Sequence, residues 1–416
     1  MAVTTESLVG QLVDLEIGAV AHGGHCVARH EGRVVFVRHA LPGELVRARI
    51  TEGDAGSSYL RADAVEILWP APGRVDPRCP VSGPGGCGGC DFQHVDLATQ
   101  RDLMSDVVRE QLRRLAGIEY DVLVEPVDAG DGLGWRTRVD FSVDADRRLG
   151  LRRHRSHAVI PVDPCPIAHR ALDDFTENRW AAERVEAVVS SRGERLAVVE
   201  SPGAGLPRLD LVGVVDGRGR RIGGRAYVRE QVHGREFRVT GKGFWQVHPA
   251  AATVLTDAVL GFAAIEPGER VADLYAGVGL FSAFLAVATG TTGLVSSVES
   301  NQRAARDARR NLHDLAQVRL VHAPVEAALK RGLVESPCDV VVLDPPRAGA
   351  RSRIVRAIAT LDPSRVVYVA CDPAALARDL ATFANEGYEL AGLRAFDVFP
   401  MTAHVECVAL LVPRRS

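Results

Sequence analysis

The C-terminal part of the chain alternates between short apolar segments and stretches in which apolar residues recur at helical spacing. Five of the apolar segments have the length of strands, and all of them lie beyond residue 241. They are Arg270–Leu274, Thr292–Val298, Asp339–Leu343, Arg365–Val369 and His404–Leu411. Strands separated by helices indicate βαβ units and a mostly parallel sheet. The sequence therefore predicts an α/β domain over residues 241–416.

The residues before this domain follow other patterns. Residues 8–68 consist of short strand-like pieces separated by glycine and proline turns, which is typical of a small β-barrel. Residues 95–117 have the apolar spacing of one amphipathic helix, and residues 122–240 indicate mixed, mainly antiparallel structure. We therefore predict three domains: a β-barrel over 1–69, a central α+β domain over 70–240 and the α/β domain over 241–416.

Composition excludes several classes of protein. With 46% hydrophobic and 25% charged residues among 416, the chain is globular rather than disordered or fibrous. A net charge of −3 excludes a uniformly basic nucleic-acid coat, although one face can still be basic. The first residues lack a secretory signal, and the longest uncharged stretch, residues 274–298, is interrupted by glycines. We expect a cytoplasmic protein with no membrane partner and no obligate protein partner.

A glycine turn follows the first strand of the α/β domain. Gly277 and Gly279 come after Arg270–Leu274, and Glu299 ends the next strand, twenty residues beyond Gly279. Glycines let the backbone approach a bound cofactor closely, and an acidic side chain at the end of the second strand accepts hydrogen bonds from ribose hydroxyls. The form Gly-x-Gly, without the third glycine of dinucleotide sites, resembles the S-adenosylmethionine site of class I methyltransferases.

Two further strand ends carry reactive side chains. Asp344 follows Asp339–Leu343 and precedes Pro-Pro-Arg347, and ligands of open α/β sheets bind at such carboxyl ends. Methyltransferases that act on exocyclic amines carry an aromatic residue where Arg347 stands, which argues against amine methylation. Cys371 ends the next strand, and a thiolate is the right nucleophile to add to C6 of a pyrimidine.

A single acidic residue interrupts the last apolar strand. Glu406 lies among apolar residues from Val405 to Val412, so we expect it to be either exposed at a sheet edge or functional. The bend before it brings Glu406 toward the rim that holds Asp344 and Cys371. His404 is expected to be a capping or core histidine.

Four of the eight cysteines are clustered. Cys79, Cys87, Cys90 and Cys165 are each flanked by glycine, proline or both, and eight cysteines are too few for a secreted disulfide scaffold. In a cytosolic chain, clustered cysteines are more often metal ligands than disulfides. Four thiolates suit a cubane iron–sulfur cluster or a tetrahedral zinc ion.

Taken together, the motifs resemble one enzyme family, the RNA uracil-5-methyltransferases, which make 5-methyluridine in ribosomal and transfer RNA. Residues 8–68 are similar to a TRAM domain, an RNA-binding barrel with an OB-like fold, and residues 241–416 to a Rossmann-like methyltransferase domain. The motifs that carry the resemblance are Gly23–Arg29, Leu41–Glu44, Gly243–Gln246, Asp273–Gly279, Asp344–Arg347, Cys371–Pro373 and Glu406.

The resemblance implies roles for individual residues. It assigns nucleophilic attack to Cys371 and proton removal to Glu406, and it assigns S-adenosylmethionine contacts to Gln246, Tyr275, Glu299 and Asp344. Ala276 and Leu280 replace a frequent cysteine and a frequent polar residue of the family, so the methionine end of the cofactor is expected to be held differently.

The resemblance also bears on the cysteines and on the RNA. It implies a [4Fe–4S] cluster held by the four clustered cysteines, with zinc as the alternative, as in members that modify ribosomal RNA. We therefore favour ribosomal over transfer RNA as substrate. Phosphate contacts are expected from a basic run that contains no carboxylate: Arg147, Arg148, Arg152, Arg153, His154, Arg155 and His157.

Two other functions remain as alternatives, and the sequence excludes a third. Methylation of cytosine C5 needs the same nucleophile. A non-catalytic RNA-binding protein that retains the fold would not need Cys371 and Glu406 together at one rim. A radical methylthiotransferase with a TRAM module would need a Cys-x-x-x-Cys-x-x-Cys triplet, which the chain does not contain.

Overall fold

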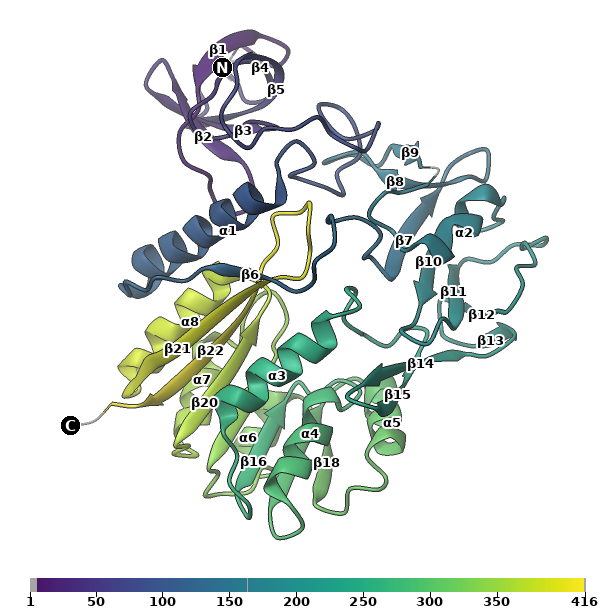
Figure 1. The fold of residues 1–416 in the computed structure, drawn as a ribbon, viewed down its shortest axis with the longest axis vertical. Coiled ribbons are helices and arrows are strands. Elements are labelled where there is room, and N and C mark those ends of the chain that lie inside the picture. The colour runs from purple at the N-terminus through teal and green to yellow at the C-terminus, as the bar shows by residue number, and fades with distance from the viewer. Residues whose placement is uncertain (1–5, 163, 415–416) are drawn as a thin grey trace, which may run out of the picture.

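Buried and more exposed residues alternate along the N-terminal strands, so that one side of each strand points into the core. In the computed structural model, which describes residues 6–162 and 164–414, five strands form one sheet in the order β1-β4-β5-β3-β2. Val35, Val37 and Leu60 point to its fully buried interior. The predicted β-rich N-terminal domain is confirmed, and it lies at the top of Figure 1. Its strands are β1 (Leu12–Glu16), β2 (Cys26–His30), β3 (Arg33–Arg38), β4 (Leu45–Glu52) and β5 (Tyr59–Trp69).

The predicted α/β domain is built on a mostly parallel sheet. Its central strands are apolar on both faces, as expected where helices cover both sides. The strand order is β18-β17-β16-β19-β20-β22-β21-β6. The parallel strands are β16 (Arg270–Leu274), β17 (Leu294–Glu299), β18 (Val318–His322), β19 (Val340–Leu343) and β20 (Arg365–Ala370). The helices are α3 (Ala251–Ala263), α4 (Leu280–Thr289), α5 (Gln302–Asn311), α6 (Val325–Lys330), α7 (Arg351–Ala359) and α8 (Pro373–Asn385).

The edge of this sheet departs from the parallel pattern. β21 (Tyr388–Asp397) and β22 (Glu406–Pro413) run antiparallel to each other, and β22 runs antiparallel to β20. The outermost strand, β6 (Val124–Pro126), comes from far earlier in the chain. The helix α1 (Leu97–Gln111), which continues as η1 (Leu112–Ala116), packs on α8, so the helix predicted over 95–117 is confirmed. The domain boundaries at residues 69 and 240 stay a prediction.

A second sheet lies beside the first. Its seven strands follow the order β13-β12-β11-β10-β7-β8-β9, and all neighbours are antiparallel except β11 and β12. The predicted mixed, mainly antiparallel character of the middle of the chain is therefore confirmed. The strands are β7 (Arg138–Val143), β8 (Leu149–Arg152), β9 (Val159–Pro161), β10 (Arg184–Val189), β11 (Arg195–Glu200), β12 (Val212–Asp216) and β13 (Arg221–Gly223). Two short helical segments, η2 (Arg170–Leu172) and α2 (Asp173–Glu177), join β9 to β10.

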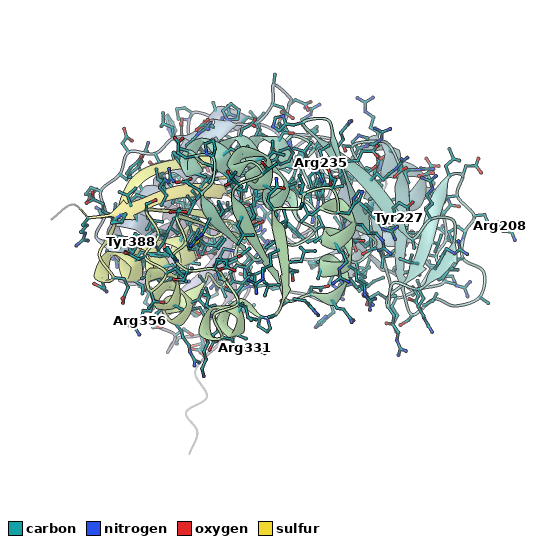
Figure 2. The ribbon with its side chains drawn as sticks, turned by 90° about the horizontal axis from the view of Figure 1, so that it is seen from below. Arg208, Tyr227, Arg235, Arg331, Arg356 and Tyr388 are labelled. Carbon is teal, nitrogen blue, oxygen red and sulfur yellow. The ribbon has the colours of Figure 1, made fainter. Side chains whose placement is uncertain are left out.

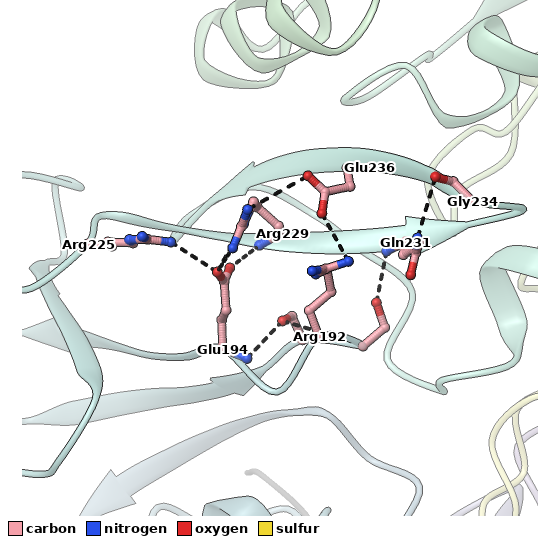
Figure 3. A network of polar contacts seen from close by, with 9 residues as sticks. Arg192, Glu194, Arg225, Arg229, Gln231, Gly234 and Glu236 are labelled. Atoms are coloured by element: carbon pink, nitrogen blue, oxygen red, sulfur yellow. Dashed lines mark hydrogen bonds and ion pairs between the residues drawn. The ribbon is translucent and has the colours of Figure 1, made fainter.

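A two-stranded hairpin connects the two sheets. It consists of β14 (Tyr227–Val232) and β15 (Arg235–Thr240). Figure 3 shows how Glu194, in the turn before β11, receives hydrogen bonds from Arg229 and Arg225, while Arg192 pairs with Glu236 at 3.1 Å. These contacts fix the hairpin to the central sheet, and thereby fix the start of the segment that follows β15.

The connection between β21 and β22 is held by the segment before α1. Met401 accepts hydrogen bonds from the backbone of Asp91 and Phe92 at 2.9 and 3.0 Å and donates its own N–H to the side chain of Gln100 at 2.9 Å. The Asp91 carboxylate receives the N–H of Ala403 at 3.0 Å. In Figure 1 this yellow connection extends from the C-terminal sheet to the meeting point of the three parts of the molecule.

Charge is spread over the surface. Arg331 and Arg356 are exposed and project outward in Figure 2.

Within the described residues, no helix has the length and hydropathy needed to cross a membrane.

Candidate active site

The sheet brings the predicted residues of four strands to one rim. Tyr275, Glu299, Asp344 and Cys371 stand at or directly after the carboxyl ends of β16, β17, β19 and β20, which are parallel neighbours. Since β22 is antiparallel, its first residue, Glu406, reaches the same rim. The register pairs Ala370 with Cys407, so Cys371 and Glu406 follow as the next positions on the two adjacent strands.

The Cys-Asp-Pro sequence explains why the thiol stands at the rim. Cys371 directly follows β20, and the next residue, Asp372, caps α8 by accepting the N–H of Ala375 at 2.7 Å. Pro373 occupies the first turn of α8, where its missing N–H costs nothing. The strand therefore stops and the helix begins within two residues, which leaves Cys371 half-buried at the junction.

Burial and neighbouring carboxyls disfavour the thiolate at Cys371. Burial, then the charges of Glu406 and Asp344, raises the pKa of Cys371 to about 12, and Arg347 opposes this shift. Burial raises the pKa of Glu406 well above its usual range; Asp344 adds to the shift and Arg347 again opposes it. Burial and the charge of Asp273 raise the pKa of Asp344 to about 7. The charges of Glu406, Asp344 and Arg347 thus all act on the Cys371 thiol. Glu406 is only 3% exposed, so the sheet-edge alternative is wrong.

The glycine turn has the features of a nucleoside site. Gly277 adopts φ +57°, and its N–H donates to Glu299 at 2.9 Å. A Cβ at Gly277 would meet nothing within 4 Å, so the space beside the turn is open. Behind it, burial raises the pKa of Asp273 to about 7, and its Oδ1 has no hydrogen-bond partner among the described residues. Open space, a strand-end carboxylate and a close backbone fit a bound nucleoside.

The other two predicted cofactor residues are Tyr275, directly after β16, and Gln246, which lies outside the strands of the rim. Tyr275 adopts φ +65°, and burial followed by the charge of Asp379 raises the pKa of its phenol to about 12. Gln246 is buried on the segment between β15 and α3, outside the strands of the rim. Arg138 holds the start of that segment by donating to the carbonyl of Gly243 at 2.8 Å.

An aspartate that the sequence did not single out fixes the loop after Asp344. Asp379, on α8, accepts the N–H of Ala350 at 2.7 Å and the hydroxyl of Tyr368 at 2.7 Å. It also accepts the N–H of Arg351 at 3.1 Å. Because α8 starts next to Cys371, Asp379 ties the Asp-Pro-Pro-Arg loop to the helix that follows the thiol. The feature of the sequence that could have identified Asp379 is an acidic residue within an apolar helix.

The N-terminal barrel also reaches the rim. His22, in the turn before β2, lies 3.1 Å from Asp372. A Cβ at Gly24 would lie 2.6 Å from the Cβ of Ala403, so only glycine allows this approach of the barrel turn to the β21–β22 connection. His404 lies 3.4 Å from Arg347, which places it beside the reactive groups rather than in a core.

The clustered cysteines line one cavity away from the rim. Cys79, Cys87 and Cys90 come from the segment between β5 and α1, and Cys165 follows β9. The cavity has a volume of about 250 Å³. Within residues 6–162 and 164–414, no group of three or more His, Cys, Asp or Glu side chains is arranged to hold a single metal ion. The thiols surround the cavity rather than converge on one point.

Polar hydrogens point at the sulfurs of this cavity. The N–H of Gly89 donates to Cys87 at 3.3 Å, and the amide of Gln93 donates to Cys90 at 3.6 Å. Such donors stabilise thiolates that bind a cluster. These donors favour the predicted iron–sulfur cluster, which stays a prediction because the described thiols do not form a metal site.

The basic run forms the β8–β9 turn. Residues Arg152–His157, with Gly88, line a hollow of about 410 Å³. Arg155 pairs with Glu52 of the barrel. Arg148 is instead paired with Asp144 at 2.9 Å, on the far end of β8.

Comparison with known proteins agrees with this geometry. The TRAM domain model matches residues 6–65, and the model described as tRNA (uracil-5-)-methyltransferase matches residues 218–414. An RNA methyltransferase of Streptomyces coelicolor is 49% identical, over 98% of this chain and 94% of its own. This chain belongs to the RNA (uracil-5-)-methyltransferase family. A Bifidobacterium longum RNA methyltransferase is 39% identical over 95% of this RNA methyltransferase and 96% of its own length.

One solved structure matches nearly the whole RNA methyltransferase. It is the tRNA (uracil-54, C5)-methyltransferase of Pyrococcus abyssi, described as a complex with S-adenosyl-L-homocysteine. The TM-score is 0.73 at 23% identity, over 96% of this chain and 100% of the other. The predicted fold, a TRAM domain followed by a Rossmann-like methyltransferase domain, is therefore confirmed.

Proposed function

We propose that this RNA methyltransferase transfers a methyl group from S-adenosylmethionine to C5 of a uridine in structured RNA through a covalent adduct with Cys371. One observation carries the proposal: β20 and β22 place Cys371 beside Glu406, with Asp344 and Arg347 close to both. A nucleophile next to a carboxylate is the arrangement that addition to a pyrimidine and later proton removal require.

The reaction starts at the thiol. Cys371 loses its proton to solvent and adds to C6 of uracil; the S–C6 bond forms, and the electrons of the C5=C6 bond move toward O4. C5 becomes nucleophilic and is methylated. Glu406 then removes the C5 proton, the C–H electrons restore the C5=C6 bond, and the C6–S bond breaks. Glu406 returns its proton to the departing thiolate, so each methyl transfer releases one proton.

Residues of the rim would hold the methyl donor. Bound S-adenosylmethionine supplies an electrophilic methyl group. We assign its ribose to Glu299, beside the open space at Gly277, and further contacts to Tyr275, Asp344 and Gln246. Arg347 favours the ionised forms of both Cys371 and Glu406, since it opposes both pKa shifts.

The cysteine cavity supports a structural [4Fe–4S] cluster rather than zinc. Zinc–sulfur bonds of about 2.3 Å would bring four sulfurs together around one point. Cys79, Cys87, Cys90 and Cys165 instead line a cavity of about 250 Å³. Protein purified without oxygen should contain iron and sulfide in equal amounts; stoichiometric zinc without iron would contradict the assignment.

We favour ribosomal RNA because the TRAM domain and the four cysteines together resemble the members that modify it. The cytoplasm provides both the RNA and the reducing conditions that keep cysteine thiols free. Mapping 5-methyluridine in both RNA pools, with and without the gene, identifies the substrate. Loss of a 5-methylcytidine instead would support the cytosine alternative.

The decisive experiment uses Glu406→Gln. This variant should add to the base and methylate it, then stall, because elimination of the thiol requires loss of the C5 proton. With radiolabelled cofactor and cellular RNA, electrophoresis under denaturing conditions should show a labelled protein–RNA adduct. Cys371→Ala should form no adduct, and Glu335→Gln, at an exposed pair with Arg319, should turn over normally. Full turnover by Glu406→Gln would remove Glu406 from the mechanism.

A further inference from the structure

The outer face of the TRAM barrel carries a row of aromatic rings. The rings of His25 and Phe36 lie 5.5 Å apart, and those of Phe36 and Tyr59 lie 5.7 Å apart. The guanidinium of Arg61 lies 5.4 Å from the Phe36 ring and 5.5 Å from the Tyr59 ring. Tyr59 is 42% exposed, and the other three side chains are partly exposed. These four residues form an aromatic platform.

The register of the barrel explains why the platform is one surface. β3 and β5 are parallel neighbours that pair Phe36 with Arg61 and Val34 with Tyr59. Val35 and Val37 fill the core, so Phe36 must point outward. The rings meet edge to face, at 72° in both pairs, and Arg61 lies over Phe36 and Tyr59, so the surface offers a ligand both ring faces and a guanidinium plane.

Cations surround the platform. Burial, then the charges of Arg61, Arg38 and Arg155, lowers the pKa of His25 to about 4, so its ring is neutral and can stack. The Nη2 atom of Arg38 is buried without a hydrogen-bond partner in the described part of the chain, 3.7 Å from Asp91. Glu52 offsets part of this charge by pairing with Arg155 and with Arg61, the latter at 3.5 Å. The hollow of Arg152–His157 adjoins this surface through the pair of Arg155 with Glu52. Among the described residues, Arg153 and Arg152 make no ion pair there, and Arg152 donates to the hydroxyl of Ser142 at 3.2 Å.

The platform is connected to the reactive thiol. His25 and His22 belong to one turn, closed by a hydrogen bond from Ala21 to His25 at 2.7 Å. His22 lies 3.1 Å from Asp372, the neighbour of Cys371. A polynucleotide whose target base reaches Cys371 therefore has an aromatic and basic surface beside it along the barrel.

We propose that the aromatic platform binds unpaired RNA bases next to the target uridine by stacking. This inference rests on the proposed function. It adds that the nucleotides next to the target uridine are single-stranded when they are bound. Stacking is open only to bases outside a duplex and tolerates any sequence, whereas arginines hold the phosphates.

The test measures binding of a short fluorescent oligouridine to the full chain by anisotropy, over a range of salt concentrations. Tyr59→Ala should weaken binding about 5- to 150-fold and leave the salt dependence unchanged. Tyr59→Phe should bind like wild type, because it keeps the ring. Arg153→Ala should lower the slope of log K against log salt by about 0.7. Trp69→Ala is the matched control, since Trp69 is a 71% exposed aromatic at the other end of β5.

Unchanged affinity of Tyr59→Ala, or equal weakening toward duplex RNA of the same length, would overturn the platform. Methyl transfer to cellular RNA is measured on the same preparations. Absent methyl transfer by wild type, together with weaker oligouridine binding by Tyr59→Ala, would contradict the proposed function and leave the platform standing.

Discussion

The rim and the cysteine cavity both hold thiols whose pKa is raised by burial, but their other neighbours differ in charge. At Cys371, Glu406 and Asp344 raise the pKa further. At Cys87 and Cys165, the charge of Arg136 and backbone N–H groups lower it against burial. If Cys371 is the nucleophile and the clustered cysteines are ligands, as we propose, the nucleophile lies beside two carboxyls, whereas the ligands lie beside Arg136 and N–H donors.

Replacing the thiol at the rim tests the first half of this comparison. Cys371→Ala should lower methyl transfer by at least about 10⁴-fold, because the covalent route has no other nucleophile. Thermal unfolding should stay within about 2 °C, since the side chain is small and half-buried. Cys338→Ala, a buried cysteine at the opposite end of β19, is the control and should keep activity. Activity in Cys371→Ala would refute the covalent mechanism.

Replacing a thiol of the cavity should have the opposite result, a large loss of stability with the chemistry retained. Cys87→Ala should lower the melting temperature by about 10 °C, because loss of one ligand costs on the order of 3–5 kcal/mol. The residual folded enzyme should still form the adduct with RNA. Cys26→Ala, buried in the barrel core and outside the cavity, should shift melting far less. A stable but inactive Cys87→Ala protein would show that the two thiol regions are not separate.

The sequence predicted the rim better than its surroundings. Apolar segments ending in Glu299, Asp344 and Cys371 are local patterns, and parallel neighbours bring their ends together whatever the rest of the chain does. The edge strand β6 and the role of Asp379 depend on pairing between distant segments. His22 and Asp372 are 350 residues apart, and no local pattern encodes such a contact.

Within the rim, the glycine turn can be separated from the reacting groups. Glu299→Ala should weaken S-adenosylmethionine binding by about 1.5–3 kcal/mol, or roughly 10- to 150-fold, through loss of charge-assisted hydrogen bonds. Glu299→Gln should fall between this variant and wild type. Calorimetry measures the affinity directly. Equal affinities of all three proteins would mean that Glu299 does not hold the ribose.

The smallest expected effect is a pH dependence. Burial raises the pKa of Asp344 to about 7, so below that pH the carboxyl is neutral and above it anionic. A sulfonium cation binds the anionic form better; affinity should therefore rise with pH by at most about tenfold per unit up to about 7 and then level off. Asp344→Asn should flatten this profile between pH 6 and 8. If the affinity of Asp344→Asn changed with pH as steeply as that of wild type, the pH dependence would come from another group.

The β21–β22 connection has a consequence for biosynthesis. Its anchors, Gln100 and Asp91, precede their partners by 301 and 312 residues. During translation the barrel, the cysteine segment and α1 are made long before Met401 and Ala403 arrive to dock on them. A nascent chain that already displays Cys371 still lacks Glu406, whose strand closes between β20 and β21 as the last piece of the sheet. Under the proposed mechanism, the base is therefore acquired only when β22 is made, and a folded chain that lacked β22 would form an adduct with RNA that it could not release.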